Sequence, residues 1–470
     1  MPNALAYLML AIWPVVTWQL YRKLPVGQAL IWAILAGYLV LPPVARFDLP
    51  AVPDMDKYSI PSLMSAVCVV LVVHRRLEFL PQNWLGRLLM AAYVLGPFGT
   101  VLTNTDPILF EEGQIGGMKL YDSFSAVANQ MIWLMPMFLG RQFLGSPEGM
   151  QALARALVLG GLAYAVPMLV EVQVSPQLNI WIYGFFQHDF FQTIRYGGYR
   201  PVVFLPHGLW VAFFTLMCLM SSVILFRAAR AEARPKALII VGFLGLMLLL
   251  CKSAGVLAYA LFFVPLLLLA GARVQIIVAA LVAGIVVVYP LLRGLHVVPL
   301  DQIVDVATSI SPERGQSLFF RIDNEEILLA RAEQRPVFGW GGFNRNFTHD
   351  PVTGETLNIA DGAWIILLGI YGWIGYLADF GLTALPLWLL GREALIGRRS
   401  DLSPLTAGMA LILAASMLDF LPNATQVPLT WLLVGALLGE AERLRALRKA
   451  RGVEQWRAGL HGGRISKTVI

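Results

Sequence analysis

The sequence predicts an all-α protein, a polytopic bundle of about 12 to 13 transmembrane helices. Hydrophobic residues make up 58% of the 470 residues and charged residues only 14%, far below the charged share of a soluble domain. Apolar runs of about 20 residues, the length that crosses a bilayer, recur along almost the whole chain. Because these runs do not alternate in polarity, and backbone amides in lipid need internal partners, they predict helices and not barrel strands.

The first of these runs has no basic segment before it and no small-residue cleavage pattern after it, so we expect a retained helix and not a removed signal peptide. Three isolated cysteines, Cys68, Cys218 and Cys251, lie in or beside apolar runs and predict neither a disulfide framework nor a metal site. The spans are expected near residues 4–21, 26–44, 60–74, 86–104, 121–140, 152–172, 204–226, 237–251, 254–270, 274–292, 373–391, 404–421 and 426–440.

Lysine and arginine gather in one set of connections, which the positive-inside rule places in the cytoplasm. This set includes Arg22, Arg141 and Arg398, and the basic tail after Glu440 shares its side. The short connections of the opposite set carry acids such as Asp106. The net charge of +6 therefore indicates topology and contact with lipid headgroups, and no nucleic-acid partner is expected. We expect a multi-pass inner-membrane protein with a cytoplasmic C-terminus.

Two long segments, residues 173–203 and 294–371, then fall on the outer, periplasmic side. The second mixes aromatic and charged residues, so we expect it to fold, with an amphipathic helix over 321–334 that Pro336 stops. A folded outer loop of this length would be unusual in a transporter, whereas in an enzyme it could form the roof of a site. The chain divides into an N-terminal transmembrane bundle (1–293), the large periplasmic loop (294–371), C-terminal transmembrane helices (372–440) and a basic cytoplasmic tail (441–470).

Basic residues on this outer side run against the positive-inside bias. Arg195 and Arg200 lie before a span, Lys252 lies in a tight turn between two apolar runs, and Arg314 and Arg321 lie in the large loop. Guanidinium groups match phosphate through paired donors of fixed geometry, so an anionic lipid-linked substrate would explain the cluster. For Arg195, Arg200 and Lys252 we favour this explanation, because a charge at a helix end near the membrane is costly without a partner.

Two further arginines of the large loop, Arg331 and Arg335, have an equally weighted alternative. They could pair with loop acids such as Glu325 and Glu333, since surface ion pairs are common and contribute little.

The candidates for acid–base chemistry are His207, His349 and Asp361, which are all expected to face the outer compartment. A lone histidine is more often structural than catalytic, and no histidine here has metal-ligand spacing. Asp361 precedes an apolar run that reaches Gly372, so it would start a short interfacial helix before the true span. Its alternative role there is that of an N-cap.

Several of these segments resemble motifs of the bacterial O-antigen polymerase and O-antigen ligase family. Phe338-Gly339-Trp340-Gly341, after the Pro336 turn, resembles the Pro-x-x-Gly-x-Gly segment that follows an Arg-containing helix in that family, and Arg321 matches that arginine. Gly372-Trp-Ile-Gly375 resembles the Gly-x-x-Gly that leads into a span. The family usually has His-Asn where this chain has Asp361-Gly362.

Two earlier segments extend the resemblance. Arg195-Tyr-Gly-Gly-Tyr-Arg200-Pro201 looks like the family's Arg-x-x-Gly-x-x-x-Pro stretch, and Lys252-Ser253 looks like its Lys/Arg-Ser turn. The similarity covers about residues 190–391, and each motif is short. Their order, spacing and shared side give the set its specificity.

The resemblance implies a glycosyltransferase that takes a glycan from undecaprenyl diphosphate at the periplasmic face of the bacterial inner membrane. The family's ligases are thought to work without a metal, and no cofactor is expected. Arginines would hold the diphosphate and a basic side chain would activate the acceptor hydroxyl, because charge stabilisation and positioning matter most for a good leaving group. The departure at Asp361 leaves three candidates for the base: Asp361, His207 and His349.

The first hypothesis is a polymerase that extends an exopolysaccharide or O-antigen chain, with the growing glycan as acceptor. The second is a ligase that transfers glycan to lipid A core or another acceptor. The loss of the His-Asn pair favours the polymerase. A transporter or flippase without transfer chemistry would predict midplane charges and inverted repeats, and the sequence has few of the first and no convincing example of the second. Membrane lipids and components of a polysaccharide export system are the further partners considered.

Overall fold

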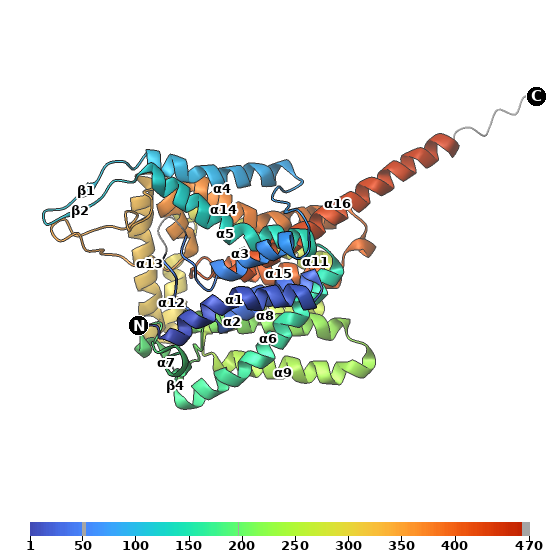
Figure 1. Ribbon diagram of the computed structural model, residues 1–470, viewed down its shortest axis with the longest axis horizontal. Coiled ribbons are helices and arrows are strands. Elements are labelled where there is room, and N and C mark those ends of the chain that lie inside the picture. The colour runs from blue at the N-terminus through green and yellow to red at the C-terminus, as the bar shows by residue number, and fades with distance from the viewer. Residues whose placement is uncertain (49–52, 196, 463–470) are drawn as a thin grey trace, which may run out of the picture.

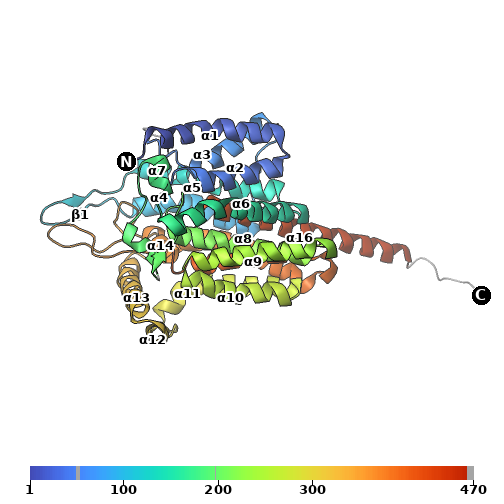
Figure 2. The same ribbon diagram turned by 90° about the horizontal axis from the view of Figure 1, so that it is seen from below.

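The computed structural model describes residues 1–48, 53–195 and 197–462, apart from the side chains at 307, 310, 313, 314 and 454–462. Most helices run side by side along the long axis of the molecule, and two lie across one end of the bundle (Figures 1 and 2). We call this end, which carries α7, β3–β4, α12 and α13, the loop end. The opposite end, from which α16 projects, is the tail end (Figure 1).

The helices of the first half are α1 (Ala4–Lys23), α2 (Val26–Val40), α3 (Ser59–Leu71), α4 (Trp84–Leu102), α5 (Leu120–Phe143), α6 (Pro147–Val174), α7 (Leu178–Tyr183) and α8 (Gly208–Ala228). Those of the second half are α9 (Arg234–Leu250), α10 (Ala254–Leu269), α11 (Ala272–Gly294), α12 (Leu300–Ile310), α13 (Pro312–Glu333), α14 (Ala363–Ile396), α15 (Pro404–Asp419) and α16 (Pro428–Gly462). Three 3₁₀ helices are η1 (Phe190–Thr193), η2 (Ala231–Ala233) and η3 (Arg399–Asp401). Two antiparallel hairpins pair β1 (Ile108–Leu109) with β2 (Gln114–Ile115) and β3 (Ile194–Arg195) with β4 (Gly198–Tyr199).

This architecture confirms the predicted all-α polytopic bundle, and each predicted span overlaps one helix. Within the described chain, seven helices are long and apolar enough to cross a membrane. Four shorter helices, α2, α3, α10 and α15, are also apolar. The protein is thus a multi-pass membrane protein by the length and composition of its helices.

Helices at the centre of the bundle pack closely against each other. The pair α5 and α16 shows why their backbones can come so near. A Cβ added at Gly140 of α5 would lie 2.6 Å from the carbonyl oxygen of Leu432, and one added at Gly435 of α16 would lie 2.0 Å from that of Met137. Backbones can approach this closely only where side chains are absent, which is how small residues stabilise helix pairs in lipid.

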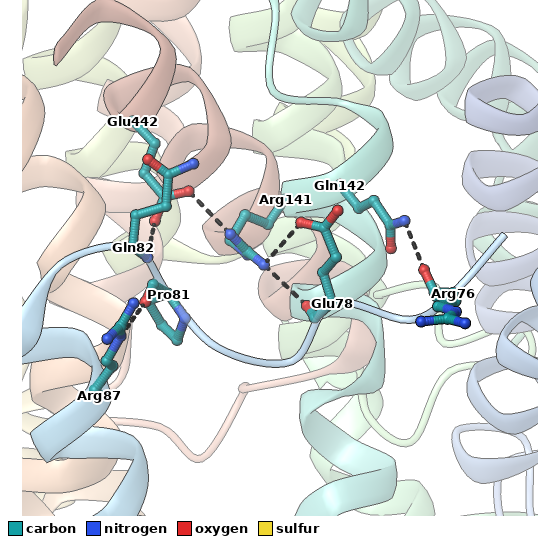
Figure 3. Close-up of polar contacts among 8 residues, drawn as sticks. All are labelled: Arg76, Glu78, Pro81, Gln82, Arg87, Arg141, Gln142 and Glu442. Carbon is teal, nitrogen blue, oxygen red and sulfur yellow. Dashed lines mark hydrogen bonds and ion pairs between the residues drawn. The ribbon is translucent and has the colours of Figure 1, made fainter. Parts of the chain in front are cut away.

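At the tail end, polar contacts tie α16 to the connections between spans (Figure 3). The buried Arg141 of α5 lies 3.0 Å from a carboxylate oxygen of the buried Glu442 and donates to the carbonyl of Glu78 at 3.0 Å. The second carboxylate oxygen of Glu442 accepts the backbone N–H of Gln82 at 2.7 Å. Charged groups that are buried here are therefore paired, as their desolvation requires.

At the loop end, the large loop is more helical than predicted. The amphipathic helix expected over 321–334 is α13, which begins at Pro312, nine residues earlier, and ends close to the predicted stop. Pro312 occupies the first turn, where its missing N–H costs nothing. The helix α12, which precedes it, was not predicted.

The start of α14 confirms the expected short helix before the break at Gly372. Residues 363–371 are helical, Gly372 has φ 64° and ψ −165°, and the helix then continues to Ile396. At this break the N–H of Trp373 donates to the carbonyl of Pro336 at 2.7 Å, and a Cβ at Gly372 would lie 2.5 Å from the Val337 oxygen. Only glycine accommodates both the positive φ and this contact.

The same break explains the second glycine motif. Gly339 has φ 69°, and the N–H groups of Trp340 and Gly341 donate to the carbonyls of Gly369 and Ile370 at 2.8 and 2.9 Å. The segments Pro336–Gly341 and Gly372–Gly375 are therefore two halves of one backbone junction between the large loop and α14.

Candidate functional site

His207 lies at the centre of the basic cluster that the sequence predicts. It is the N-cap of α8: its Nδ1 accepts the N–H of Leu209 at 3.1 Å, and its Nε2 lies 3.3 Å from Oε1 of Gln192. The ring of His188 packs edge-on against it, with centroids 4.4 Å apart. Burial, followed by the charge of Arg200, lowers the pKa of His207 to about 3, so the imidazole is neutral at physiological pH.

The arginines Arg195 and Arg200 reach this place from the β3–β4 hairpin. Arg195 ends β3 and is exposed, whereas Arg200 follows β4 and is buried. The backbone N–H of Arg200 donates to the carbonyl of Thr193 at 2.9 Å, and its guanidinium lies over the first turn of α8, where a Cβ at Gly208 would be 2.6 Å from Nε. The hairpin thus carries one guanidinium outward and one inward.

Lys252 joins the cluster from the predicted tight turn between α9 and α10. Its Nζ donates to the carbonyl of Arg195 at 3.0 Å and lies against Gly198, where a Cβ would be only 2.5 Å away. Its backbone has φ 49°, a left-handed conformation that costs a non-glycine residue free energy. A strained backbone is retained where the surroundings hold it, and such positions cluster at functional sites.

A buried carboxylate that was not predicted fixes the segment between Arg200 and His207. Glu171, near the end of α6, accepts the N–H groups of Val202 and Val203 at 2.8 Å and that of Leu178 at 3.1 Å. Val203 has φ 53°, which is unfavourable for a β-branched residue. The sequence contained a signal for this role, since an acid inside an apolar run has a functional or structural reason to be there.

Arg321 of α13 brings the large loop to the cluster. Its Nε lies 3.2 Å from Oδ2 of Asp361, and its Nη1 donates to the carbonyl of Pro422 at 3.3 Å. Both partners of the ion pair are about one-third exposed, at 35% and 38% of the side-chain surface. The positive charge of Arg321 also disfavours the charged form of His207, which places it in the same electrostatic environment as Arg195 and Arg200.

The structure corrects the alternative role of Asp361. The N-cap of α14 is Gly362, which makes no side-chain capping hydrogen bond, and Asp361 lies one residue before it. The N–H of Ala363 instead donates to the carbonyl of Phe420 at 3.0 Å. Asp361 is thus free of a capping role, and its carboxylate is held by Arg321.

Glu325 lies one helical turn after Arg321 on α13 and was not predicted as a site residue. It is buried, 3.9 Å from the buried Arg293 of α11. Burial raises the pKa of Glu325 to about 7, Arg293 opposes this rise, and the charge of Asp361 adds to it. A spacing of four residues places Arg321 and Glu325 on one face of the helix, which was the available sequence signal.

The arginines Arg331 and Arg335 both lie against Trp340. Their guanidinium carbons lie 3.3 and 4.4 Å from the ring centroid of Trp340, and Arg335 also donates to the carbonyl of Thr103. They pair with an aromatic ring and backbone carbonyls where loop acids were expected.

His349 lies apart from the cluster. The backbone of His349 pairs with that of Thr356 in an isolated β-bridge. Its ring packs on the ring of Phe110, beside the β1–β2 hairpin, with the two centroids 5.3 Å apart. In Figure 1 this hairpin and β4 lie at opposite edges of the loop end. Burial and then Arg331 lower the pKa of His349. The side chain of Arg314 lies outside the described part of the chain.

The loop end thus brings the charges of Arg195, Arg200 and Arg321 to a neutral His207, with Lys252 against the β3–β4 hairpin and Asp361 paired with Arg321. Such an arrangement can bind a polyanion and hold a hydroxyl near a carboxylate. Among the described side chains, no group of three or more His, Cys, Asp or Glu could hold a metal ion. Comparison with protein-family models and with curated protein sequences finds no match for this chain.

Proposed function

We propose that this protein is a membrane glycosyltransferase of the O-antigen polymerase and ligase type, and that it extends a polysaccharide from undecaprenyl-diphosphate-linked units. The observation that carries the proposal is that the charge of Arg321 reaches the same histidine as those of Arg195 and Arg200, while Lys252 contacts the hairpin that carries both. These residues come from a hairpin, a turn and the large loop, segments far apart in the sequence. A lipid-linked diphosphate at the membrane surface has the charge and the position to bind there.

In the proposed reaction, the acceptor hydroxyl oxygen bonds to the anomeric carbon of the donor glycan. The bond from that carbon to the diphosphate oxygen breaks, and the diphosphate leaves with the electron pair. The hydroxyl proton passes to the carboxylate of Asp361. Arg321, whose Nε contacts Oδ2 and whose Nη1 donates to Pro422, would orient that carboxylate while its Nη2 donates to the diphosphate.

Asp361 is favoured over the histidines as the base for a physical reason. Both ring nitrogens of His207 are engaged, and its pKa of about 3 makes it a weak base. His349 lies beside the β1–β2 hairpin instead of the cluster. The carboxylate of Asp361 is partly exposed and adjacent to the cations.

The direct test is Asp361→Asn in the purified protein, supplied with lipid-linked repeat units. We expect the transfer rate to fall by about 10²–10⁴-fold, the usual contribution of a general base. Asp361→His should retain part of the rate, and binding of the donor should persist in both variants. An Asp361→Asn protein that makes polymer at the normal rate would exclude Asp361 as the base. Successive additions in the product ladder would favour a polymerase, and a single addition a ligase.

The proposal also requires the loop end to face the periplasm, where lipid-linked glycans are polymerised. Reporter domains fused after Arg314 and after Arg399 should therefore report opposite compartments, the first periplasmic and the second cytoplasmic. The structure places these fusion points at opposite ends of the bundle, in α13 and η3. A cytoplasmic signal from the first fusion would contradict the proposal, because the site would then face away from the lipid-linked glycans.

A further inference from the structure

A second feature lies on the other side of the first turns of α14. An open cavity of about 340 Å³ is lined by residues of α4, α5, α14, the start of α16 and the connection between α15 and α16. A second cavity of about 280 Å³ adjoins it toward the large loop, and the two share the lining residues Ala126, Asn129 and Tyr371. Volumes of about 300 Å³ and above are typical of ligand sites.

The larger cavity contains a buried carboxylate at membrane depth. Asp379 of α14 is 3% exposed and accepts a hydrogen bond from Nε2 of Gln426 at 2.9 Å. Seven residues, about 10 Å of helix, separate it from the break at Gly372. An ionisable group inside a membrane segment is costly, so a carboxylate that lines a cavity there points to a ligand.

The chemistry of the lining selects the class of ligand. Polar contacts come from the carboxylate of Asp379 and the amides of Gln426 and Asn129, which can accept from and donate to hydroxyl groups. Flat apolar faces come from Trp133, Tyr371 and Trp431. Neither cavity is lined by lysine or arginine. An uncharged, hydroxyl-rich ring with apolar faces fits this lining, whereas a phosphate does not.

The connection between α15 and α16 joins this cavity to the basic cluster. Its Pro422 carbonyl accepts from Arg321, and its Gln426 donates to Asp379. Asp419, at the start of the connection, fixes its shape by accepting from Asn423 at 2.9 Å and Thr425 at 2.6 Å. Ala363, two residues after Asp361, also lines the cavity. Asp361 thus contacts the cation Arg321 and lies two residues from the cavity lining.

We infer that this cavity binds the saccharide of the acceptor, with Asp379, Gln426 and Asn129 holding its hydroxyl groups. The inference rests on the proposed function, since it assigns the second substrate of the same reaction. The donor diphosphate would occupy the basic cluster, and the acceptor would approach from the opposite side of Asp361. The terminal hydroxyl of a glycan in the cavity would then face the carboxylate that takes its proton.

The test measures binding of two probes to the purified full-length protein. One is the oligosaccharide repeat unit freed from its lipid carrier, and the other is geranylgeranyl diphosphate, a short polyprenyl diphosphate without sugar. Ala126→Phe fills the space shared by the two cavities without touching a charge, and Gln426→Ala removes an amide. Ala128→Phe, on the same helix but outside the lining, is the matched control.

We expect Ala126→Phe and Gln426→Ala to weaken oligosaccharide binding by at least about tenfold, with little change in diphosphate binding. Arg321→Ala should weaken diphosphate binding with little change in oligosaccharide binding. Ala128→Phe should change neither. Oligosaccharide binding that is absent from the wild type, or equal in wild type and Ala126→Phe, would overturn the inference. A loss of geranylgeranyl diphosphate binding in Ala126→Phe would also overturn it and assign the cavity to the lipid tail. If Arg321→Ala binds the diphosphate normally, the proposed function fails, whatever the oligosaccharide result.

Discussion

The two ends of the bundle use the same residue types in opposite ways. At the tail end, Arg141 pairs with Glu442, Arg448 with Glu393 and Arg443 with Glu440 (Figure 3 shows the first pair). At the loop end, the charges of three arginines act on one neutral histidine, Lys252 contacts the carbonyl of Arg195, and Asp361 pairs with Arg321. Each of these tail-end arginines has its own carboxylate, whereas the loop-end cluster brings like charges close to one histidine.

This difference separates structural from functional arginines. A buried pair satisfies the desolvated charge within the fold, so its loss affects stability first. A cluster of like charges is unfavourable in the folded protein alone and becomes favourable when an anion binds.

The largest expected effect is on the tail end. Glu442→Ala leaves the buried Arg141 without its main carboxylate and the Gln82 N–H without its acceptor, so the variant should lose about 3–5 kcal/mol of stability. The melting temperature of the purified protein measures this. Asp54→Ala, which breaks the exposed pair with Arg46, should cost no more than about 1 kcal/mol. The comparison between the two ends fails if Glu442→Ala melts normally but loses transfer activity.

The next effect concerns the loop end. Arg321→Ala should lower the transfer rate by about 10²–10³-fold, as the loss of one transition-state donor does, with a near-normal melting temperature. Arg321→Lys should recover little, since an ammonium cannot contact Asp361 and a diphosphate together through a planar fork. Arg448→Lys at the tail end is the matched control and should keep full activity. A normal transfer rate in Arg321→Lys would show that the positive charge of Arg321 suffices and that its planar fork is not needed.

The smallest effect is a pH dependence at the edge of the cluster. Because its pKa is raised to about 7, Glu325 is mostly neutral below pH 7 and gains negative charge above it, next to Arg321. We expect the KM for the lipid-linked donor to rise a few-fold between about pH 6 and 8, and this rise to be absent in Glu325→Gln. The same raised pKa stabilises the fold at low pH, and that contribution is lost as the pH increases through 7. A KM that rises equally in both proteins would assign the effect elsewhere.

The sequence predicts the fold well because hydropathy directly reports membrane spans. It also singled out Arg195, Arg200, Lys252 and Arg321, which all lie outside the spans against the positive-inside bias. Their convergence on one diphosphate site stays a prediction. It could not show that Gly362, and not Asp361, caps α14, because helix ends depend on contacts such as that of Ala363 with Phe420. Glu171 and Asp379 were missed because the residues they bind, Val202 and Gln426, are distant in the sequence.

The junction between Pro336–Gly341 and the break at Gly372 has a consequence for motion. Four backbone hydrogen bonds cross it, from Trp340, Gly341, Trp373 and Ile374 to carbonyls of the opposite segment. These bonds attach the large loop to α14 at the C-terminal end of α13. The helix that carries Arg321 therefore cannot move away from α14 at this end unless the hydrogen bonds break. This end of the large loop is therefore fixed to α14, and under the proposed function a donor would reach Arg321 without displacing it.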